Sequence, residues 1–202
     1  MNKLYLINKR VLDLTSSFLG LILLSPFLLI IALWIKMDSK GPIFFRQLRV
    51  GKNGKDFYIH KFRSMRVDSE KSGQLTIGND DRITRSGRFI RKYKIDELAQ
   101  LIDVFIGTMS LVGPRPEVPK YMAHYSQDVR EKILSAKPGI TDLASIEMFD
   151  ENEILSKYDD PINAYIEIIM PIKAGFYLEY IKKQSIIFDI KIIFLTLAKI
   201  IK

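Results

Sequence analysis

The chain has 202 residues and no cysteine, so disulfides and thiolate metal sites are excluded. Its length suits one domain with a real core, or a small domain plus a membrane element. Lysine and arginine number 31 against 23 aspartate and glutamate, a formal net charge of +8, and hydrophobic residues make up 48%. Such a charge suits nucleic acid, anionic lipid or phosphorylated substrates, and the added apolar content favours a membrane surface over a free DNA-binding domain.

The first predicted element is an apolar helix over residues 14–35, which contain no charged residue. About 22 helical residues, or roughly 33 Å, are enough to cross the hydrocarbon core. Ser25-Pro26 lies near the middle, where proline deprives the Ile22 carbonyl of its helical donor. The Ser25 hydroxyl is a candidate to satisfy the backbone groups that proline frees.

Basic residues flank both ends of this segment, and basic flanks mark the cytoplasmic side of a membrane helix. They are Lys3, Lys9 and Arg10 before it, and Lys36, Lys40, Arg46 and Arg49 after it. The residues alone leave two alternatives open: a kinked helix that spans the bilayer, or a helix that enters, breaks at Ser25-Pro26 and returns.

Residues 42–65 predict a β-hairpin, because two aromatic and β-branched runs flank the turn GKNGK. The strand period puts Lys61 and Arg63 on one face, either as a phosphate-binding edge or as the solvated face of the hairpin. A polar, exposed loop is expected over residues 66–80. His60 and His124 have no carboxylate or second histidine at ligand spacing, so we interpret both as structural or surface residues.

A helical pattern follows from Arg82 to Thr108. It opens with arginines at every third position, namely Arg82, Arg85, Arg88 and Arg91. Arginine suits bidentate phosphate contacts, although a solvated basic face explains any single one of these residues equally well.

Asp96 and Glu97 stand where the strongest helical pattern begins, at Ile95. The helix dipole stabilises carboxylates at this position, which is a sufficient structural explanation. The functional alternative is that the pair binds Mg²⁺ through oxygen ligands, or that one carboxylate attacks phosphorus. Nearby arginines would then neutralise phosphate oxygens.

The rest of the chain predicts a rigid loop and three helices. GPRP at 113–116 holds Arg115 between two prolines, which would lower the entropy lost when Arg115 binds an anion; the alternative is a rigid turn with an incidental arginine. Helices are expected over 119–136 and 161–181, the latter with a kink or boundary at Pro171. The tail 186–202 is a helix with a broad apolar face, suited either to the membrane interface or to the domain core.

Together these pieces resemble the bacterial sugar transferases, the monotopic phosphoglycosyl transferases that act on polyprenyl phosphate. The resemblance runs from KRVLD at 9–13 to the tail. It rests on the order of short motifs: the apolar segment with Ser25-Pro26, PIFFRQLRVGKNGKDFYIHKFRSM, TRSGRFIRKYKIDELAQL, SLVGPRP and KPGIT.

The resemblance implies transfer of a sugar phosphate from a UDP-sugar to polyprenyl (undecaprenyl) phosphate with release of UMP, and Mg²⁺ as cofactor. Asp96 would be the nucleophile that forms a covalent phosphosugar intermediate, and Glu97 would assist in metal binding or in handling the acceptor phosphate. The family's basic positions map onto Lys61, Arg91 and Arg115. We add Arg63 as a phosphate-binding candidate from the strand pattern.

Two departures from the family pattern bear on substrate identity and on the site. Ala99 stands where members often have proline, which removes a helix-start residue but no chemistry. Members often have glycine at Asp142, glutamine at Ser145 and an arginine near Phe149, a region expected to touch the sugar or the nucleotide. The sugar and the pathway, O-antigen or another polysaccharide, stay open.

The expected fold class is α+β and mainly helical, with an N-terminal re-entrant membrane helix, a small β-hairpin and amphipathic interfacial helices. Residues 1–40 would be the re-entrant helix, broken at Ser25 and Pro26, and residues 41–202 a catalytic domain on the cytoplasmic face of the bacterial inner membrane. The chain resembles the minimal catalytic core of larger relatives. Expected partners are UDP-sugar, polyprenyl phosphate and membrane lipid but no nucleic acid, and oligomers remain open. The alternative is a non-enzymatic basic module that binds membrane surfaces.

Overall fold

The computed structural model describes residues 3–67, 69, 73, 75–76, 80–148 and 151–201, so Phe149 and much of the expected loop 66–80 lie outside the described residues. The described chain is mainly helical, with an antiparallel hairpin and a short parallel strand pair. Its α-helices are α1 (Lys3–Asp38), α2 (Arg85–Lys92), α3 (Leu101–Ile106), α4 (Pro119–Met122), α5 (Gln127–Ser135), α6 (Leu143–Glu147), α7 (Glu151–Leu155), α8 (Pro161–Ala164), α9 (Met170–Lys183) and α10 (Ile186–Ile201).

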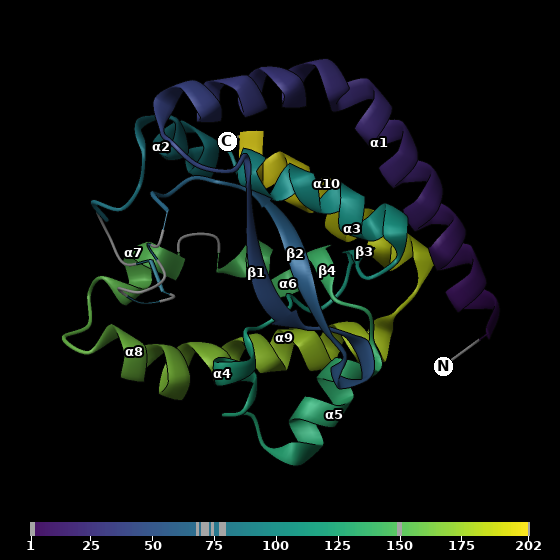
Figure 1. The fold of residues 1–202 in the computed structure, drawn as a ribbon. Coiled ribbons are helices and arrows are strands. Elements are labelled where there is room, and N and C mark those ends of the chain that lie inside the picture. Colours follow the sequence, from purple (N-terminus) through teal and green to yellow (C-terminus); the bar gives the residue numbers. More distant parts are fainter. Residues whose placement is uncertain are drawn as a thin grey trace.

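Helix α1 bends around the outside of the molecule (Figure 1). It remains helical through Ser25 and Pro26, so the expected break is a bend within a continuous helix rather than a gap between two helices. The Ser25 hydroxyl donates to the Ile22 carbonyl at 2.8 Å, which confirms the partner expected for the group that Pro26 leaves free. By length and composition, α1 is the helix of the described chain that could cross a membrane.

Polar bonds fix both halves of α1 to the rest of the domain. In the first half, Arg10 donates to two carbonyls in the last turn of α3 at 2.7 and 2.8 Å, and Asp13 accepts from the Ser110 hydroxyl at 3.0 Å. At the far end, Asp38 accepts from the Ser86 amide and hydroxyl, both at 2.8 Å. The outward face of α1 stays apolar and exposed.

The predicted hairpin is confirmed. Strands β1 (Phe44–Val50) and β2 (Asp56–Phe62) pair antiparallel, and a 3₁₀ turn over Lys52–Gly54 connects them. Phe45 lies directly opposite Lys61 in the register, so both side chains leave the same face of the hairpin.

A second sheet was not predicted. Strands β3 (Ser110–Val112) and β4 (Gly139–Thr141) pair in parallel; β3 leads into the GPRP loop, and β4 leads into α6. The backbones meet so closely that a Cβ on Gly113 would lie 2.2 Å from the Lys137 carbonyl oxygen. Glycine is therefore required there, and the contact fixes the start of the GPRP loop.

Two expected helices are interrupted in the structure. The pattern over 82–108 divides into α2, a 3₁₀ helix (Ile95–Gln100) and α3, because Lys94 adopts a left-handed backbone with φ of 54°. The expected helix 119–136 divides into α4 and α5. Pro171 lies in the first turn of α9, after a π-helical turn (Tyr165–Ile169), which confirms it as a boundary.

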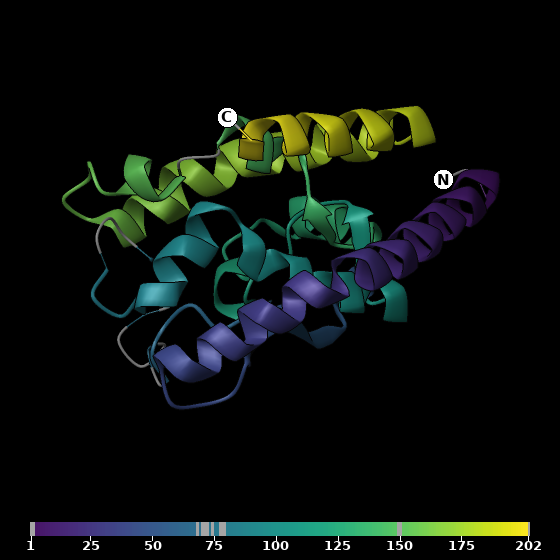
Figure 2. The ribbon, with the colours of Figure 1, turned by 90° about the horizontal axis from the view of Figure 1, so that it is seen from above.

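The domain forms layers between two groups of helices. In Figure 2, α9 and α10 lie along one side, and α1 runs diagonally from near the end of α10 toward the opposite side. The largest apolar cluster joins α4, α5 and α9 through buried side chains such as Tyr121, Ile133 and Tyr177. Helix α10 buries Ile192 but exposes Ile187 and Phe194, so one face packs on the core and the other is open.

Candidate active site

Asp96 and Glu97 lie in the first turn of the 3₁₀ helix that follows the Lys94 turn. The turn sends them inward, and Asp96 is only 3% exposed. Lys61, from the end of β2, places its Nζ 2.9 Å from Asp96 Oδ2 and 3.4 Å from Glu97 Oε1. The hairpin and the acid pair, separated in sequence, therefore form one ion cluster.

Arg115 completes this cluster from the GPRP loop. Its Nη1 donates to Glu97 Oε2 at 3.1 Å, and its Nη2 contacts Glu97 Oε1, which makes the contact bidentate. Burial alone would raise the pKa of Glu97, but the charges of Arg115 and Lys61 outweigh burial and hold that pKa well below its usual range. Glu97 raises the pKa of Arg115 in return. Glu97 is therefore a fixed anion.

One oxygen of the acid pair has no hydrogen-bond partner in the part of the chain that the structure describes. Asp96 Oδ1 is buried and makes no hydrogen bond with any described residue. Glu97, in contrast, has both oxygens engaged by Arg115. The described residues contain no group of three or more histidines or carboxylates able to hold a metal ion. Mg²⁺ commonly uses one or two carboxylates together with substrate phosphates, so the acid pair fits such an ion, with Asp96 Oδ1 as the free ligand.

Arg91 also reaches this region. It lines two adjoining cavities together with Lys61 and Arg115. Its guanidinium makes no hydrogen bond with the described part of the chain. Lys94 lines the smaller cavity beside the acid pair, and burial lowers its pKa.

Arg63 has a different role from the one expected. Its guanidinium donates to the carbonyls of Ser39, Lys40 and Pro42 at 2.7 to 2.8 Å, and the side chain is buried. These bonds tie the end of α1 to the hairpin and use the groups a phosphate would need. Arg63 borders the larger cavity, but the structure does not bring it to the acid pair.

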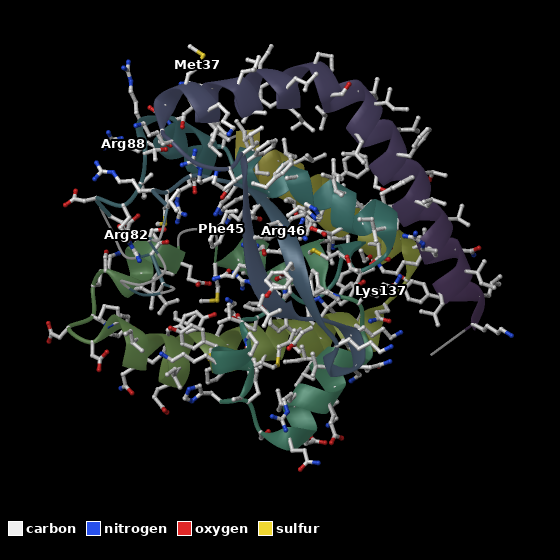
Figure 3. The ribbon with its side chains drawn as sticks, in the orientation of Figure 1. Met37, Phe45, Arg46, Arg82, Arg88 and Lys137 are labelled. Carbon is white, nitrogen blue, oxygen red and sulfur yellow. The ribbon has the colours of Figure 1, made fainter. Side chains whose placement is uncertain are left out.

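The arginines of the three-residue repeat also separate. Arg82 binds Asp80 and donates to three loop carbonyls, those of Ser69, Gly73 and Leu75. Arg88 projects outward, away from the centre of the molecule (Figure 3). Only Arg91 of the four lines both cavities.

His60 has a carboxylate partner that spacing did not reveal. Its Nδ1 lies 2.7 Å from Asp103 Oδ1, and its backbone amide donates to Asp103 Oδ2 at 2.8 Å. Asp103 belongs to α3, so the pair joins the hairpin to that helix. The structural interpretation of His60 stands.

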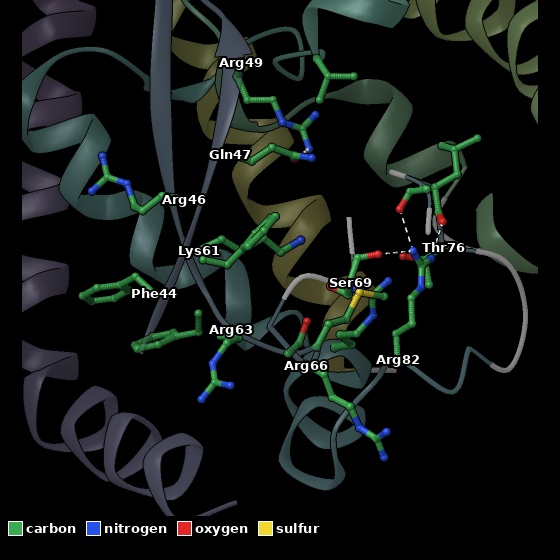
Figure 4. A pocket seen from close by; sticks show the side chains of 18 of the residues that line it. Phe44, Arg46, Gln47, Arg49, Lys61, Arg63, Arg66, Ser69, Thr76 and Arg82 are labelled. Atoms are coloured by element: carbon green, nitrogen blue, oxygen red, sulfur yellow. Dashed lines mark hydrogen bonds between the residues drawn. The ribbon is translucent and has the colours of Figure 1, made fainter. Parts of the chain in front are cut away.

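Two cavities meet at the basic residues. The larger, of about 660 Å³, lies beside the hairpin, and Figure 4 shows its wall of arginines with Lys61. The smaller, of about 260 Å³, contains the acid pair and is walled by α6 and α10, including Ser145 and Thr196. Asp142 does not line either cavity, because it is buried as the N-cap of α6 and accepts from the Ser145 amide.

Sequence reasoning missed a buried lysine on α9. Lys173 lines both cavities, and its Nζ lies 3.2 Å from Glu151 and 3.4 Å from Glu117. Tyr165 donates to Glu117 at 2.7 Å. The sequence did carry one signal for it: Lys173 is the single lysine in the otherwise uncharged run IIMPIKAGFY. A lysine that is buried in such a run needs a charged partner.

The chain thus combines a long apolar helix with a buried acid pair where two basic cavities meet. The chain belongs to the bacterial sugar transferase family, whose sequence pattern it matches over residues 4–202. The resemblance drawn from the motifs is thereby confirmed.

Characterised relatives agree with this membership. The chain is 40% identical over 195 residues to UDP-glucose:undecaprenyl-phosphate glucose-1-phosphate transferase of Escherichia coli (strain K12), covering 95% of this chain and 39% of the relative. It is 41% identical over 204 residues to the protein of that name in Klebsiella pneumoniae, covering 98% and 41%. It is 40% identical over 200 residues to the exopolysaccharide production protein PSS of Rhizobium leguminosarum bv. phaseoli, covering 96% and 94%. The chain thus spans about two fifths of the first two relatives and nearly all of the third.

Proposed function

We propose that this protein is a phosphoglycosyl transferase that moves a sugar-1-phosphate from a UDP-sugar to undecaprenyl phosphate and releases UMP, at the first membrane step of a bacterial glycoconjugate pathway. The observation that carries the proposal is the buried Asp96–Glu97 pair, neutralised by Lys61 and Arg115 where two basic cavities meet. The relatives named for this reaction support the same substrates.

The reaction would proceed in two steps at Asp96. A carboxylate oxygen attacks the phosphorus that carries the sugar, and the bond from that phosphorus to the bridging oxygen breaks, so UMP leaves with the electron pair. An oxygen of undecaprenyl phosphate then attacks the aspartyl phosphosugar. The bond between the phosphorus and the Asp96 carboxylate then breaks, which restores Asp96 and yields undecaprenyl diphosphate sugar.

The neighbouring charges suit these steps. Lys61 and Arg115 offset the negative charge of the acid pair, which would otherwise repel an incoming diphosphate. Arg91 has a guanidinium available for phosphate oxygens. Mg²⁺ held by Asp96 and Glu97 would supply further charge neutralisation on the phosphate oxygens. Glu97, held as an anion by Arg115, is suited to hold the cation rather than to donate a proton.

The attachment of α1 supports a re-entrant, monotopic topology with the site on the cytoplasmic side, where nucleotide sugars are found. Lys9 pairs with Asp189 of α10 at 2.8 Å, and at the other end Asp38 binds Ser86. Both ends of the apolar helix therefore contact one domain, whereas a helix that spans the bilayer would carry its first residues to the far side. A tag at the N-terminus should be reachable only from the cytoplasmic side, and labelling from the periplasm would favour the kinked span.

A basic module that only binds membrane surfaces accounts less well for the site. Surface binding needs exposed cations, whereas Lys61 and Arg115 are directed at buried carboxylates. Such a module would be indifferent to replacement of Asp96. The enzyme is therefore the stronger proposal.

The test is UMP release from a panel of UDP-sugars by purified protein with undecaprenyl phosphate and Mg²⁺. Asp96→Asn should lose on the order of 10⁴-fold or more of the rate, as expected for removal of a nucleophile. The matched control is Asp128→Asn, which changes an exposed carboxylate on α5. Full UMP release by Asp96→Asn would exclude Asp96 as the nucleophile, and no release by the wild type with any UDP-sugar would refute the proposed function.

A further inference from the structure

The two cavities divide the site unequally. Lys61, Arg91 and Arg115 line both, but the acid pair lines only the smaller cavity. These three cations, together with Lys173, which is paired with Glu117 and Glu151, therefore lie at a junction, with the acid pair on one side and a separate basic cavity on the other.

The cavity volumes limit what each side can accept. Ligand cavities for drug-sized molecules run from about 300 to 1,000 Å³. The smaller cavity, at about 260 Å³, falls below this range, whereas the larger, at about 660 Å³, lies within it. A UDP-sugar whose reacting phosphorus meets Asp96 must place much of its bulk beyond the smaller cavity.

Phe45 is placed to receive a flat ring in the larger cavity. It lies opposite Lys61 in the hairpin register, so its ring stands beside the junction. Its side chain lines only the larger cavity and is half-buried. Among the described residues, Phe45 stacks on no other aromatic ring, whereas the adjacent Phe44 stacks on Phe62.

The cations of the larger cavity are not equally available. Arg49 donates to the Pro116 carbonyl at 2.8 Å, and Arg63 and Arg82 are bound to loop carbonyls. These three arginines shape the wall. Arg66 and Arg91 make no side-chain hydrogen bond in the described chain, and of these two only Arg91 also lines the smaller cavity, so it lies at the junction where a phosphate would bind.

We propose that the larger cavity is the nucleotide subsite: the nucleobase of the donor stacks on Phe45, and Arg91 binds the phosphate that leaves with the nucleoside. This inference rests on the proposed function, because it divides one UDP-sugar between the two cavities. A lipid phosphate carries no base, so the acceptor has no group that would use Phe45, and only its phosphate has to reach the acid pair. Phe45 thus discriminates donor from acceptor by a flat ring face that the lipid cannot use.

The first experiment measures UMP binding by titration calorimetry on purified full-length protein. Stacking of a base on an aromatic ring contributes to nucleotide affinity whatever the base. Phe45→Leu, which keeps apolar bulk but removes the ring, should therefore weaken UMP binding about tenfold, and Phe45→Trp should retain it. The matched control is Tyr58→Ala, an exposed aromatic residue of the same hairpin that lines neither cavity. Equal UMP affinity in Phe45→Leu and wild type would overturn the proposal.

Kinetics separate the donor from the acceptor. Phe45→Leu should raise the KM for the UDP-sugar about tenfold and leave the KM for undecaprenyl phosphate within about twofold. A rise in the acceptor KM alone would overturn the assignment. If the wild type binds UMP but transfers no sugar phosphate, the proposed function fails while the nucleotide subsite stands.

A third measurement needs no variant and therefore does not depend on how substitutions fold. Irradiation of the wild type with 5-iodouridine monophosphate should label the peptide that contains residues 44–49. Label confined to residues 139–148, which border the smaller cavity, would place the base beside the acid pair and overturn the proposal.

Discussion

Lys61 and Asp96 form an ion pair of 2.9 Å that joins the end of the hairpin to the acid pair, while the second oxygen of Asp96 makes no hydrogen bond with the described residues. Lys61→Met should abolish this pair and leave Asp96 buried beside Glu97 with less positive charge. We expect UMP release to fall at least 100-fold, because like charges would then repel the donor diphosphate. Steady-state UMP release measures this, with Lys55→Met at the exposed hairpin turn as control. A rate within threefold of wild type would show that Lys61 is structural only.

Arg115→Lys should be far from conservative. The guanidinium holds both oxygens of Glu97, which a single ammonium cannot do. We expect kcat to fall about 10- to 100-fold while the protein stays folded. The measurement is kcat together with the melting temperature in detergent. Unchanged kcat would mean that bidentate contact with Glu97 is not needed.

Glu97 should make stability depend on pH. Although burial alone would raise its pKa, Arg115 and Lys61 hold that pKa below the ordinary 4.5, so the folded protein keeps the charge where the unfolded chain binds a proton. This contribution is therefore full above about pH 4.5 and is lost as pH falls toward the folded-state pKa. Glu97→Gln should destabilise the protein by on the order of 3 kcal/mol at pH 7 and by less at pH 4.

Denaturant unfolding at the two pH values checks this prediction. Glu147→Gln, at an exposed position on α6, is the matched control. An equal loss of stability at both pH values would mean that Glu97 is not held ionised by its partners.

The close approach of β3 and β4 gives a stability prediction with an internal control. Gly113→Ala would bring a Cβ within 2.2 Å of the Lys137 carbonyl oxygen and should lower the free energy of unfolding by about 2 kcal/mol. Gly175→Ala, in α9, meets nothing within 4 Å and should raise stability by about 0.5–1 kcal/mol. Thermal unfolding of both variants is the measurement. Equal melting temperatures would contradict the close contact.

Removal of Mg²⁺ should abolish UMP release if Asp96 Oδ1 is a metal ligand. EDTA treatment should reduce the rate to background, and added Mg²⁺ should restore it. In the same assay Asp96→Asn should not be rescued by excess Mg²⁺. Full activity in EDTA would mean that Asp96 Oδ1 is not a metal ligand and acts only as the attacking oxygen.

The sequence predicted those elements whose formation depends on residues close together in the chain. The hairpin, the boundary at Pro171, the tail helix and the hydrogen bond from Ser25 to Ile22 follow from periods, turn residues and the chemistry of proline. The parallel β3–β4 pair was not predictable, because three-residue strands carry no period and their pairing depends on two glycines far apart in sequence.

The site was predictable only where motif residues converge. Lys61, Asp96, Glu97 and Arg115 meet as expected, and Arg91 lies at their edge. Arg63 lies just past the end of β2, where side chains no longer have to alternate between the two faces of a strand. The alternation therefore did not predict where its side chain lies. The partnership of His60 with Asp103 depends on the packing of α3, which spacing along the chain does not reveal.

The polar attachment of α1 has a consequence for the order in which the chain is made. The helix is synthesised first, yet the groups that fix it, such as Ser86 and Ser110, appear roughly 50 to 100 residues later. Until then Arg10, Asp13 and Asp38 lack their partners. We therefore expect the final position of the helix to be fixed late, when the rest of the domain packs against it.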